Sequence, residues 1–339
     1  MTATEQNNVL TARDFASDQE IKWCPSCGDY TILKQIQSIL PEYITKKENV
    51  VFVSGIGCSS RLPYYMNTYG LHSIHGRATA IATGIKLINP ELEVWVITGD
   101  GDLMSIGGNH FIHLLRRNPN LRLIMFNNEI YGLTKGQYSP TSYKGQVTKS
   151  TPFGSVDEPF NPPALALGAK ATFVARTIDR DPKHQQTIYR RATRHKGTAF
   201  VEVYQNCPVF NDETFKLLTE KDTKKDHTLM LEHGKPLIFG AQNDKGVRLD
   251  GLKPVVVDLN TGISPDELWI HDETDKTKAF LLARFAELEN MPCPFGVFYC
   301  EQRACFEDDV HGQMRYAAEK QKPIPLQKIL SGDNTWEVV

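Results

Sequence analysis

Two apolar runs that each end in a polar turn constrain this chain more than any other feature. The first run, Val94 to Thr98, ends in Gly99-Asp100-Gly101-Asp102, and the second, Leu121 to Phe126, ends in Asn127-Asn128. Twenty-five residues separate Gly101 from Asn127, which is enough for one helix and one returning strand, as a parallel strand pair requires. Both turns should therefore lie at the carboxyl ends of neighbouring strands, where open α/β sheets bind ligands.

The residue types in these two turns suit a site for a metal ion and a diphosphate. Gly99 and Gly101 let the backbone approach phosphate oxygens closely, and a helix expected to begin near Ser105 would aim free N–H groups at an anion. Asp100 and Asn128 offer the oxygen ligands that Mg²⁺ prefers. The alternative is two ordinary strand-end turns, but the paired arrangement of the two turns favours the site.

The bulk properties describe an ordinary globular protein. The chain has 339 residues, 40% hydrophobic and 23% charged, and a net charge of −2, which argues against non-specific binding to nucleic acid. No apolar run reaches the length of a membrane span. Residues 1–19 are polar, lack the apolar region of a signal peptide, and are predicted to form a loosely held arm. We therefore expect a cytoplasmic protein with neither a nucleic-acid nor a membrane partner.

Seven cysteines in such a chain indicate metal or cluster ligation rather than a disulfide framework. Cys24 and Cys27 form a Cys-x-x-Cys pair, which by itself fits a redox dithiol, half a zinc site or part of an iron–sulfur site. Cys58 and Cys207 each follow a predicted strand, at residues 49–53 and 199–203. Four thiolates suit a 4Fe–4S cluster or a structural zinc, and the spacing does not choose between them.

The remaining cysteines form a rival set. Cys293, Cys300 and Cys305 fall in or beside an apolar run at residues 295–299, where buried and inert thiols are common.

A glycine- and serine-rich turn follows the strand predicted at residues 49–53. Gly55 and Gly57 would again allow a ligand to approach the backbone, and Ser59 can donate to a phosphate oxygen. Arg61 suits recognition of a carboxylate, although a solvated surface arginine is an equally good interpretation.

Three more candidates come from loops. His75, before a small-residue helix at 78–88, suits diphosphate contact or proton transfer, although a lone histidine is more often structural. Thr134 and Lys135 lie in an irregular stretch from residue 129 to about residue 163, which is typical of a binding loop.

Apolar periodicity and turn residues predict the other elements. We expect helices at 30–40, with Asp29 as a candidate cap, and at 164–167, 182–195, 276–288 and 308–319; strands at 171–175 and 255–257; a hairpin of 237–240 with 246–249; and a charged linker at 219–227.

Five motifs together resemble the beta subunits of the 2-oxoacid:ferredoxin oxidoreductases. In chain order they are Trp23-Cys24-Pro25-Ser26-Cys27-Gly28, Gly55-Ile56-Gly57-Cys58, His75-Gly76-Arg77-Ala78, Gly99-Asp100-Gly101-Asp102 and Ile130-Tyr131-Gly132-Leu133-Thr134-Lys135-Gly136-Gln137. The Gly-Asp-Gly and Asn-Asn pair resembles the thiamine diphosphate signature, and Asn206-Cys207-Pro208-Val209-Phe210-Asn211 is most similar to the 2-oxoglutarate branch. The resemblance is strong over residues 20 to 215.

The resemblance implies three cofactors and assigns residues to them. Mg²⁺ would be held by Asp100, Asn128 and the Ile130 carbonyl, and one 4Fe–4S cluster by Cys24, Cys27, Cys58 and Cys207. Thiamine diphosphate would be contacted by Gly55, Gly57, Cys58, Ser59, His75, Gly99, Asp100, Gly101, Asp102, Asn128, Ile130, Gly132, Leu133 and Thr134. Arg61, Lys135 and His75 would face the substrate.

The resemblance also implies a fold, an activity and partners. The expected fold is α/β, a diphosphate-binding domain at 20–215 with a mostly parallel sheet and helices on both faces, followed by an extension at 216–339 that packs on the core or on a partner. The expected reaction is oxidative decarboxylation of 2-oxoglutarate with coenzyme A, giving succinyl-CoA and CO₂, with electrons passed through the cluster to ferredoxin. Activity would need an alpha subunit in an αβ or (αβ)₂ enzyme. The alternatives are a pyruvate or broad-range enzyme, and a non-redox decarboxylase with a structural zinc.

Overall fold

A mixed eight-stranded sheet forms the centre of the molecule. The computed structural model describes residues 10–321, 323–336 and 338. The strands lie in the order β2-β1-β3-β4-β8-β7-β13-β9, and in this order their bounds are Tyr69–His72, Val50–Ser54, Glu93–Gly99, Arg122–Asn127, Ala199–Tyr204, Phe173–Ile178, Cys293–Cys300 and Thr228–Leu231. β2, β1, β3, β4, β8 and β7 run parallel, and β13 pairs antiparallel with β7. The expected mostly parallel α/β fold is confirmed.

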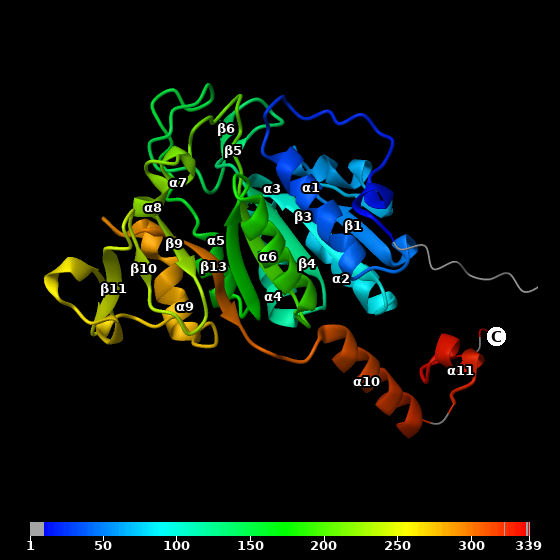
Figure 1. Cartoon of the computed structure of the whole chain (residues 1–339). Coiled ribbons are helices and arrows are strands. Elements are labelled where there is room, and N and C mark those ends of the chain that lie inside the picture. The colour runs from blue at the N-terminus through cyan, green and yellow to red at the C-terminus, as the bar shows by residue number, and fades with distance from the viewer. Residues whose placement is uncertain (1–9, 322, 337, 339) are drawn as a thin grey trace, which may run out of the picture.

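Helices cover both faces of this sheet (Figure 1). The helices on one face include α1 (Asp29–Ile39) and α6 (Pro182–Arg194), which contact each other, and the other face carries α2 (Ala78–Ile88), α4 (Gly108–Arg117), α5 (Pro162–Gly168) and α9 (Lys276–Ala283). Because both faces are covered, the central strands are mostly apolar, and every residue of β1, β4, β7 and β8 is buried.

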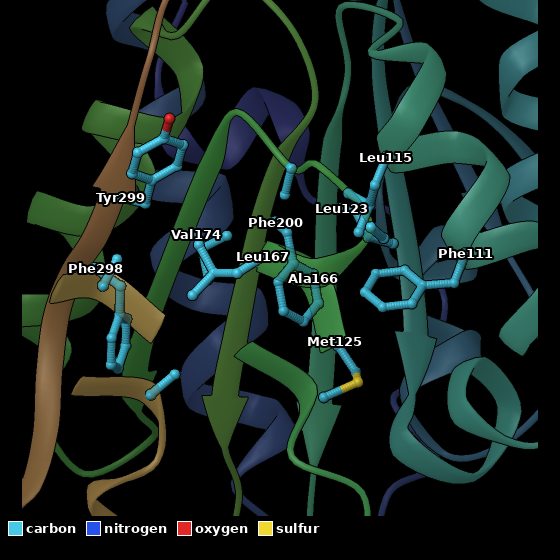
Figure 2. Close-up of a cluster of buried hydrophobic side chains, with 14 of the residues drawn as sticks. Phe111, Leu115, Leu123, Met125, Ala166, Leu167, Val174, Phe200, Phe298 and Tyr299 are labelled. Atoms are coloured by element: carbon cyan, nitrogen blue, oxygen red, sulfur yellow. The ribbon is translucent and has the colours of Figure 1, made fainter. Parts of the chain in front are cut away.

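Two hydrophobic cores lie on the two faces. Figure 2 shows part of one, in which Phe111 of α4 faces Phe200 of β8 with ring centroids 5.1 Å apart. On the other face Ile32 and Ile36 of α1 pack toward Tyr189 of α6, and all three are buried. These apolar contacts fix the strand ends relative to one another, which matters for the site below.

The described part of the predicted N-terminal arm is anchored rather than loose. Residues 1–9 lie outside the described residues, but Ala12–Phe15 forms the short 3₁₀ helix η1 and Phe15 is fully buried. Asn67 donates its backbone N–H to the Phe15 carbonyl at 2.9 Å. Burial of one large aromatic ring explains why this polar stretch is ordered.

The C-terminal third does more than pack against the core, because β9 and β13 from residues 216–339 are strands of the main sheet. The expected hairpin is present as β10 (Ile238–Phe239) and β11 (Lys245–Asp250), and with β12 (Lys253–Asp258) it makes a separate three-stranded sheet. The charged stretch predicted as a linker at 219–227 ends in a short helix, α8 (Lys224–His227), and another short helix, α7 (Lys216–Thr219), leads into it.

The last two helices, α10 (Phe306–Lys320) and α11 (Leu326–Ser331), extend away from the sheet (Figure 1). α10 is tied to the body near its start, where Glu307 accepts the Asn120 backbone N–H at 3.1 Å and the His311 Nε2 lies 2.7 Å from the Leu87 carbonyl.

Short elements complete the fold. They are α3 (Asp100–Met104), β5 (Ile130–Tyr131) and β6 (Gln137–Tyr138), and the 3₁₀ helices η2 (Leu40–Glu42), η3 (Lys47–Asn49), η4 (Ser59–Tyr65), η5 (Leu259–Thr261), η6 (Pro265–Glu267) and η7 (Phe285–Glu287). Among the residues that the structure describes, no helix is both long and apolar enough to cross a membrane.

Candidate active site

Four turns meet at one edge of the sheet and form a pocket. They follow β1, β3, β4 and β8, which are neighbours and run parallel, so their carboxyl ends lie together. The pocket is lined by Asp29, Ile56, Gly57, Cys58, Ser59, His75, Gly99, Asp100, Gly101, Asp102, Phe126, Asn128, Ile130, Tyr131, Gly132, Leu133, Thr134 and Gln205.

The pocket brings together nearly all of the residues that the sequence pointed to for the cofactor. Of the fourteen predicted contacts, Gly55 is the exception that does not line it. A Cβ on Gly55 would lie 1.8 Å from the Asp102 Oδ2, so this glycine lets β1 approach that carboxylate rather than a ligand.

Asp100 is a buried carboxylate whose side-chain partners are hydroxyls. Its Oδ2 accepts hydrogen bonds from the hydroxyls of Ser139 at 2.5 Å and Thr141 at 2.7 Å, and its side chain is almost fully enclosed. Burial raises the pKa of Asp100 to about 6 despite these bonds. A divalent cation would supply the positive charge that the hydroxyls do not.

The helix that follows Asp100 begins earlier than expected. We predicted a helix start near Ser105, but α3 begins at Asp100 itself, stops at Met104, and α4 begins only at Gly108. The chain breaks here because the turn at Gly76 comes close: a Cβ on Gly76 would lie 2.4 Å from the Gly107 nitrogen. That prediction was wrong by about one helical turn.

Asp102 joins three segments of the site. Its Oδ1 accepts the backbone N–H groups of Ile56 at 3.1 Å and Gly76 at 2.9 Å, and its Oδ2 accepts the Thr98 hydroxyl at 2.8 Å. The His75 Nδ1 lies 2.7 Å from the same Oδ1. His75 is thereby oriented at the pocket wall with its ring partly exposed.

The Asn-Asn turn divides its two amides between the pocket and the core. Asn128 lines the pocket and donates its Nδ2 to the Gln205 Oε1 at 2.8 Å, while its Oδ1 accepts the Ile130 N–H at 3.3 Å. Asn127 points inward and donates to the Glu202 Oε1 at 2.8 Å.

A buried ion pair lies beneath Asn127. The Arg176 Nε donates to the Glu202 Oε2 at 2.6 Å, and both side chains are inaccessible to solvent. The Arg176 guanidinium also lies over the rings of Tyr204, at 4.8 Å, and Phe298, at 5.4 Å. This network holds the floor of the site in one arrangement.

The four predicted cluster ligands converge from three loops. A Cβ on Gly132 would lie 3.5 Å from the Cys58 sulfur and 3.6 Å from the Cys207 sulfur, so both thiols lie next to this glycine. Burial raises the pKa of the Cys27 thiol, and the nearby Cys58 and Cys207 add to the effect. Burial likewise raises the pKa of Cys58 to about 12, with contributions from Cys207 and Cys24.

These loops are tied together by direct hydrogen bonds. The Trp23 indole donates to the Cys58 carbonyl at 2.7 Å, and the Gly28 N–H donates to the Asn206 carbonyl at 3.3 Å. Cys24 is exposed, Cys27 and Cys58 are partly buried, and Cys207 is buried. The group of thiols therefore reaches from the pocket to the protein surface.

Asp29 has an unexpected place in this site. We considered it a helix cap, but the cap position is Gly28 and the Asp29 side chain is buried with no hydrogen-bond partner for either carboxylate oxygen. Burial and the neighbouring Asp179 raise the pKa of Asp29 to about 7.

The two basic candidates differ in their positions. Arg61 lies in η4 near Cys58 and lines a second hollow that adjoins the pocket at Gly57 and Leu133. Lys135 is exposed, adopts a φ of 78°, and lines neither hollow. The structure thus brings Arg61, but not Lys135, to the hollow beside the pocket.

The rival cysteines do not form a group at the pocket. Cys293 accepts from the Arg176 Nη1 at 3.6 Å, Cys300 lies 3.8 Å from the His195 Nδ1, and Cys305 is buried. Over residues 10–321, 323–336 and 338, no three His, Cys, Asp or Glu side chains are placed to hold a metal ion as a group, so Cys24, Cys27, Cys58 and Cys207 lie near one another without forming a site for a single ion. The proposed Mg²⁺ ligands include only one such side chain.

Sequence reasoning missed five pocket residues: Asp29, Ile56, Phe126, Tyr131 and Gln205. Tyr131 carried a signal, because it lies in the Ile130–Gln137 motif, and its hydroxyl donates to the Gly101 carbonyl at 2.8 Å. Gln205 directly follows β8, and a polar residue at a strand end is the kind of signal that identified Asn128.

The fold and the pocket define a thiamine diphosphate-binding protein, and comparison with known proteins agrees. Residues 55–203 match the family described as thiamine pyrophosphate enzyme, C-terminal TPP binding domain. The 2-oxoglutarate oxidoreductase subunit KorB of Mycobacterium tuberculosis is 49% identical over 331 residues, which cover 96% of this chain and 88% of that protein. The chain belongs to the family of 2-oxoacid:ferredoxin oxidoreductase beta subunits.

Two further relatives support this membership. The beta subunit of a Sulfolobus 2-oxoacid:ferredoxin oxidoreductase is 46% identical over 61% of this chain and 68% of its own. The structure of a 2-oxoglutarate:ferredoxin oxidoreductase from Magnetococcus marinus, with 2-oxoglutarate, coenzyme A and succinyl-CoA bound, matches with a TM-score of 0.77 and 30% identity, covering 98% of both chains.

Proposed function

We propose that this chain is the beta subunit of a 2-oxoglutarate:ferredoxin oxidoreductase. The reaction is oxidative decarboxylation of 2-oxoglutarate with coenzyme A, giving succinyl-CoA and CO₂, with the electrons passed to ferredoxin. The observation that carries the proposal is the 49% identity to a 2-oxoglutarate oxidoreductase subunit over 96% of the chain.

The pocket residues fit a magnesium diphosphate. Asp100 supplies a buried carboxylate that lacks a counter-cation, and Asn128 and Ile130 supply an amide oxygen and a carbonyl at the facing turn. Gly99 and Gly101 both line the pocket, and a Cβ on Gly101 would lie 2.3 Å from the Tyr131 ring, so this glycine makes room for Tyr131 at the pocket wall. Bound thiamine diphosphate supplies the nucleophile and the electron sink for decarboxylation, and these residues fix its position.

The thiol group fits a 4Fe–4S cluster. Burial and the neighbouring thiols raise the pKa values of Cys27 and Cys58, and a coordinated metal would take these cysteines as thiolates and remove that cost. The exposed position of Cys24 gives the cluster a side at the protein surface, and this is where ferredoxin would accept electrons.

Arg61 fits recognition of a dicarboxylate. Its guanidinium belongs to the hollow beside the pocket and carries a fixed positive charge there. We assign it to the distal carboxylate of 2-oxoglutarate. Lys135 has no comparable contact, and a role for it requires that the substrate or the partner subunit reach the exposed loop.

An alpha subunit would complete the site. Among the described residues, one sheet carries diphosphate-type turns, whereas the cofactor also needs a pocket and an activating carboxylate for its aminopyrimidine ring. We place these on the alpha chain, so the beta subunit alone is inactive.

The test is anaerobic co-purification with the alpha subunit, followed by dye reduction with each 2-oxoacid and coenzyme A. We expect 2-oxoglutarate to be turned over much faster than pyruvate, with thiamine diphosphate, magnesium and iron in the purified complex. A complex that contains zinc instead of iron and decarboxylates without reducing the dye would support the non-redox alternative and refute the proposal. Turnover by the beta subunit alone would refute the shared active site.

A further inference from the structure

We propose that Gln205 is a positioning residue that couples the cluster ligand Cys27 to the metal ligand Asn128 through its side-chain amide. This inference rests on the proposed function, because it assigns Cys27 to the cluster and Asn128 to the metal ion. It adds that the two cofactor sites share one hydrogen-bonded residue that belongs to neither ligand set.

The amide of Gln205 lies between the two sites. Its Nε2 donates to the Cys27 sulfur at 3.3 Å, and its Oε1 accepts the Asn128 Nδ2 at 2.8 Å. The second hydrogen of its Nε2 is directed to the Asn206 carbonyl. The side-chain oxygen and both N–H groups of Gln205 therefore have partners within the protein.

The cluster ligand Cys27 determines the orientation of both side-chain amides in this series of hydrogen bonds. A thiolate sulfur can only accept a hydrogen bond, so Gln205 must turn its Nε2 toward Cys27 and its Oε1 toward Asn128. Asn128 must then present its Nδ2 to Gln205. Its Oδ1, which accepts the Ile130 N–H at 3.3 Å, is turned away from Gln205 and keeps a second lone pair for a cation, which is the orientation that a magnesium ligand requires.

Burial makes this arrangement specific. Gln205 is 1% exposed, so water cannot replace a missing partner and a rotated amide would place like groups against each other. The loop of Cys27 also packs directly on this side chain, because a Cβ on Gly28 would lie 2.9 Å from the Gln205 Cγ. The backbone N–H of Gln205 is fixed as well, by a bond of 2.9 Å to the Asn127 carbonyl.

Two consequences follow from these contacts. An N–H···S bond to a cluster thiolate stabilises the reduced, more negative state, so Gln205 raises the reduction potential of the cluster. A hydrogen bond that orients a ligating side chain raises metal affinity, typically by 10- to 100-fold. One substitution should therefore change a property of each cofactor.

The experiment compares Gln205→Leu with the unaltered αβ complex. We expect the ratio of reduced to oxidised cluster at a fixed potential to fall about tenfold, a shift of about 59 mV for a one-electron couple, in an electron paramagnetic resonance titration. We expect the affinity for Mg²⁺ in the presence of thiamine diphosphate, measured by calorimetry, to fall about tenfold.

A second variant guards against a folding defect in the first. Gln205→Glu keeps the size of the side chain but places a titrating group against the sulfur, so the cluster potential should fall as the pH rises more steeply than in the unaltered complex. The matched control is Gln35→Leu, which removes another buried glutamine whose Oε1 accepts the Gln186 Nε2 at 2.7 Å away from the pocket. We expect it to leave both readouts unchanged.

The outcomes separate this inference from the proposed function. If the unaltered complex contains no iron–sulfur cluster, the proposed function fails and this inference fails with it. If the cluster is present but neither Gln205 variant changes its potential, or the control changes it equally, only the role of Gln205 is refuted. A changed potential with unchanged Mg²⁺ affinity would refute the coupling.

Discussion

Asp102 should contribute more to the free energy of unfolding than its position at the edge of a pocket suggests. Replacing Asp102 with alanine leaves the backbone N–H groups of Ile56 and Gly76 without their acceptor, and the Thr98 hydroxyl without its closer one. Each buried donor that loses its partner costs about 1–3 kcal/mol. The Thr98 hydroxyl has a second acceptor in the Gly99 carbonyl, at 3.2 Å, so we count two orphaned groups and expect a loss of about 2–6 kcal/mol.

The matched variant is Asp102→Asn. Its single oxygen can still accept the two N–H groups, and its Nδ2 can donate to the Thr98 hydroxyl, which then donates to Gly99. Only the charge-assisted part of the bonds is lost, so we expect a cost of about 1–2 kcal/mol. The free energies of unfolding are compared by urea denaturation of the two variants and the unaltered protein. If the alanine variant is as stable as the asparagine variant, Asp102 does not join the three segments as described.

Three further results are expected. The pKa of Asp100 is raised to about 6, so the folded metal-free protein keeps a proton that the unfolded chain releases. Its stability should therefore fall as the pH rises from about 4 to 6. If Asp100 is a ligand, the affinity for Mg²⁺, measured by calorimetry, should fall about tenfold per pH unit below 6 and be flat above it. Gly55→Ala should destabilise the protein and weaken cofactor binding, because its Cβ would meet a buried carboxylate oxygen at 1.8 Å. Gly84→Ala has open space around its Cβ and should stabilise helix α2 by about 0.5–1 kcal/mol. Equal melting temperatures of the two variants would contradict this contrast. Arg176→Met should lower the free energy of unfolding by about 3–5 kcal/mol because it leaves the buried Glu202 charge unpaired. Adding Glu202→Gln should restore most of this loss. A double variant no more stable than the single one would show that the charge is not the cause.

Four strands of the parallel half of the sheet could be predicted because each carries its own local signal, whereas β2, whose four residues are all exposed, was not predicted. β1, β3, β4 and β8 are apolar runs, and each ends at a glycine or at a polar turn. Helix α2 was predicted with its observed bounds, Ala78–Ile88, because small and apolar residues recur at helical spacing.

The antiparallel edge carried no comparable signal. β13 was predicted as an apolar run, but its partners β7 and β9 are far from it in sequence and nothing local sets their register. The predicted boundary between residues 215 and 216 placed β9 and β13 outside the domain whose sheet they extend.

The missed pocket residues show the same limit at the level of side chains. Gln205 matters because it meets Cys27, 178 residues earlier in the chain, and Asp29 because it is enclosed by loops that the sequence does not bring together. Contacts of this kind depend on the completed fold. The resemblance to a family supplied the ligand sets, but it named only residues that touch the cofactors.

The hydrogen bonds between the cysteine-bearing loops bear on how the protein would respond to the loss of a bound cluster. Trp23 ties its loop to the Cys58 carbonyl, and Gly28 ties the same loop to Asn206, and neither bond uses a sulfur atom. The cysteine-bearing loops are thus held together by the polypeptide itself. If the proposed cluster binds there, we expect that oxygen damage can remove its iron while the loops keep their arrangement, so that repair needs only reinsertion of a cluster and not a new round of folding.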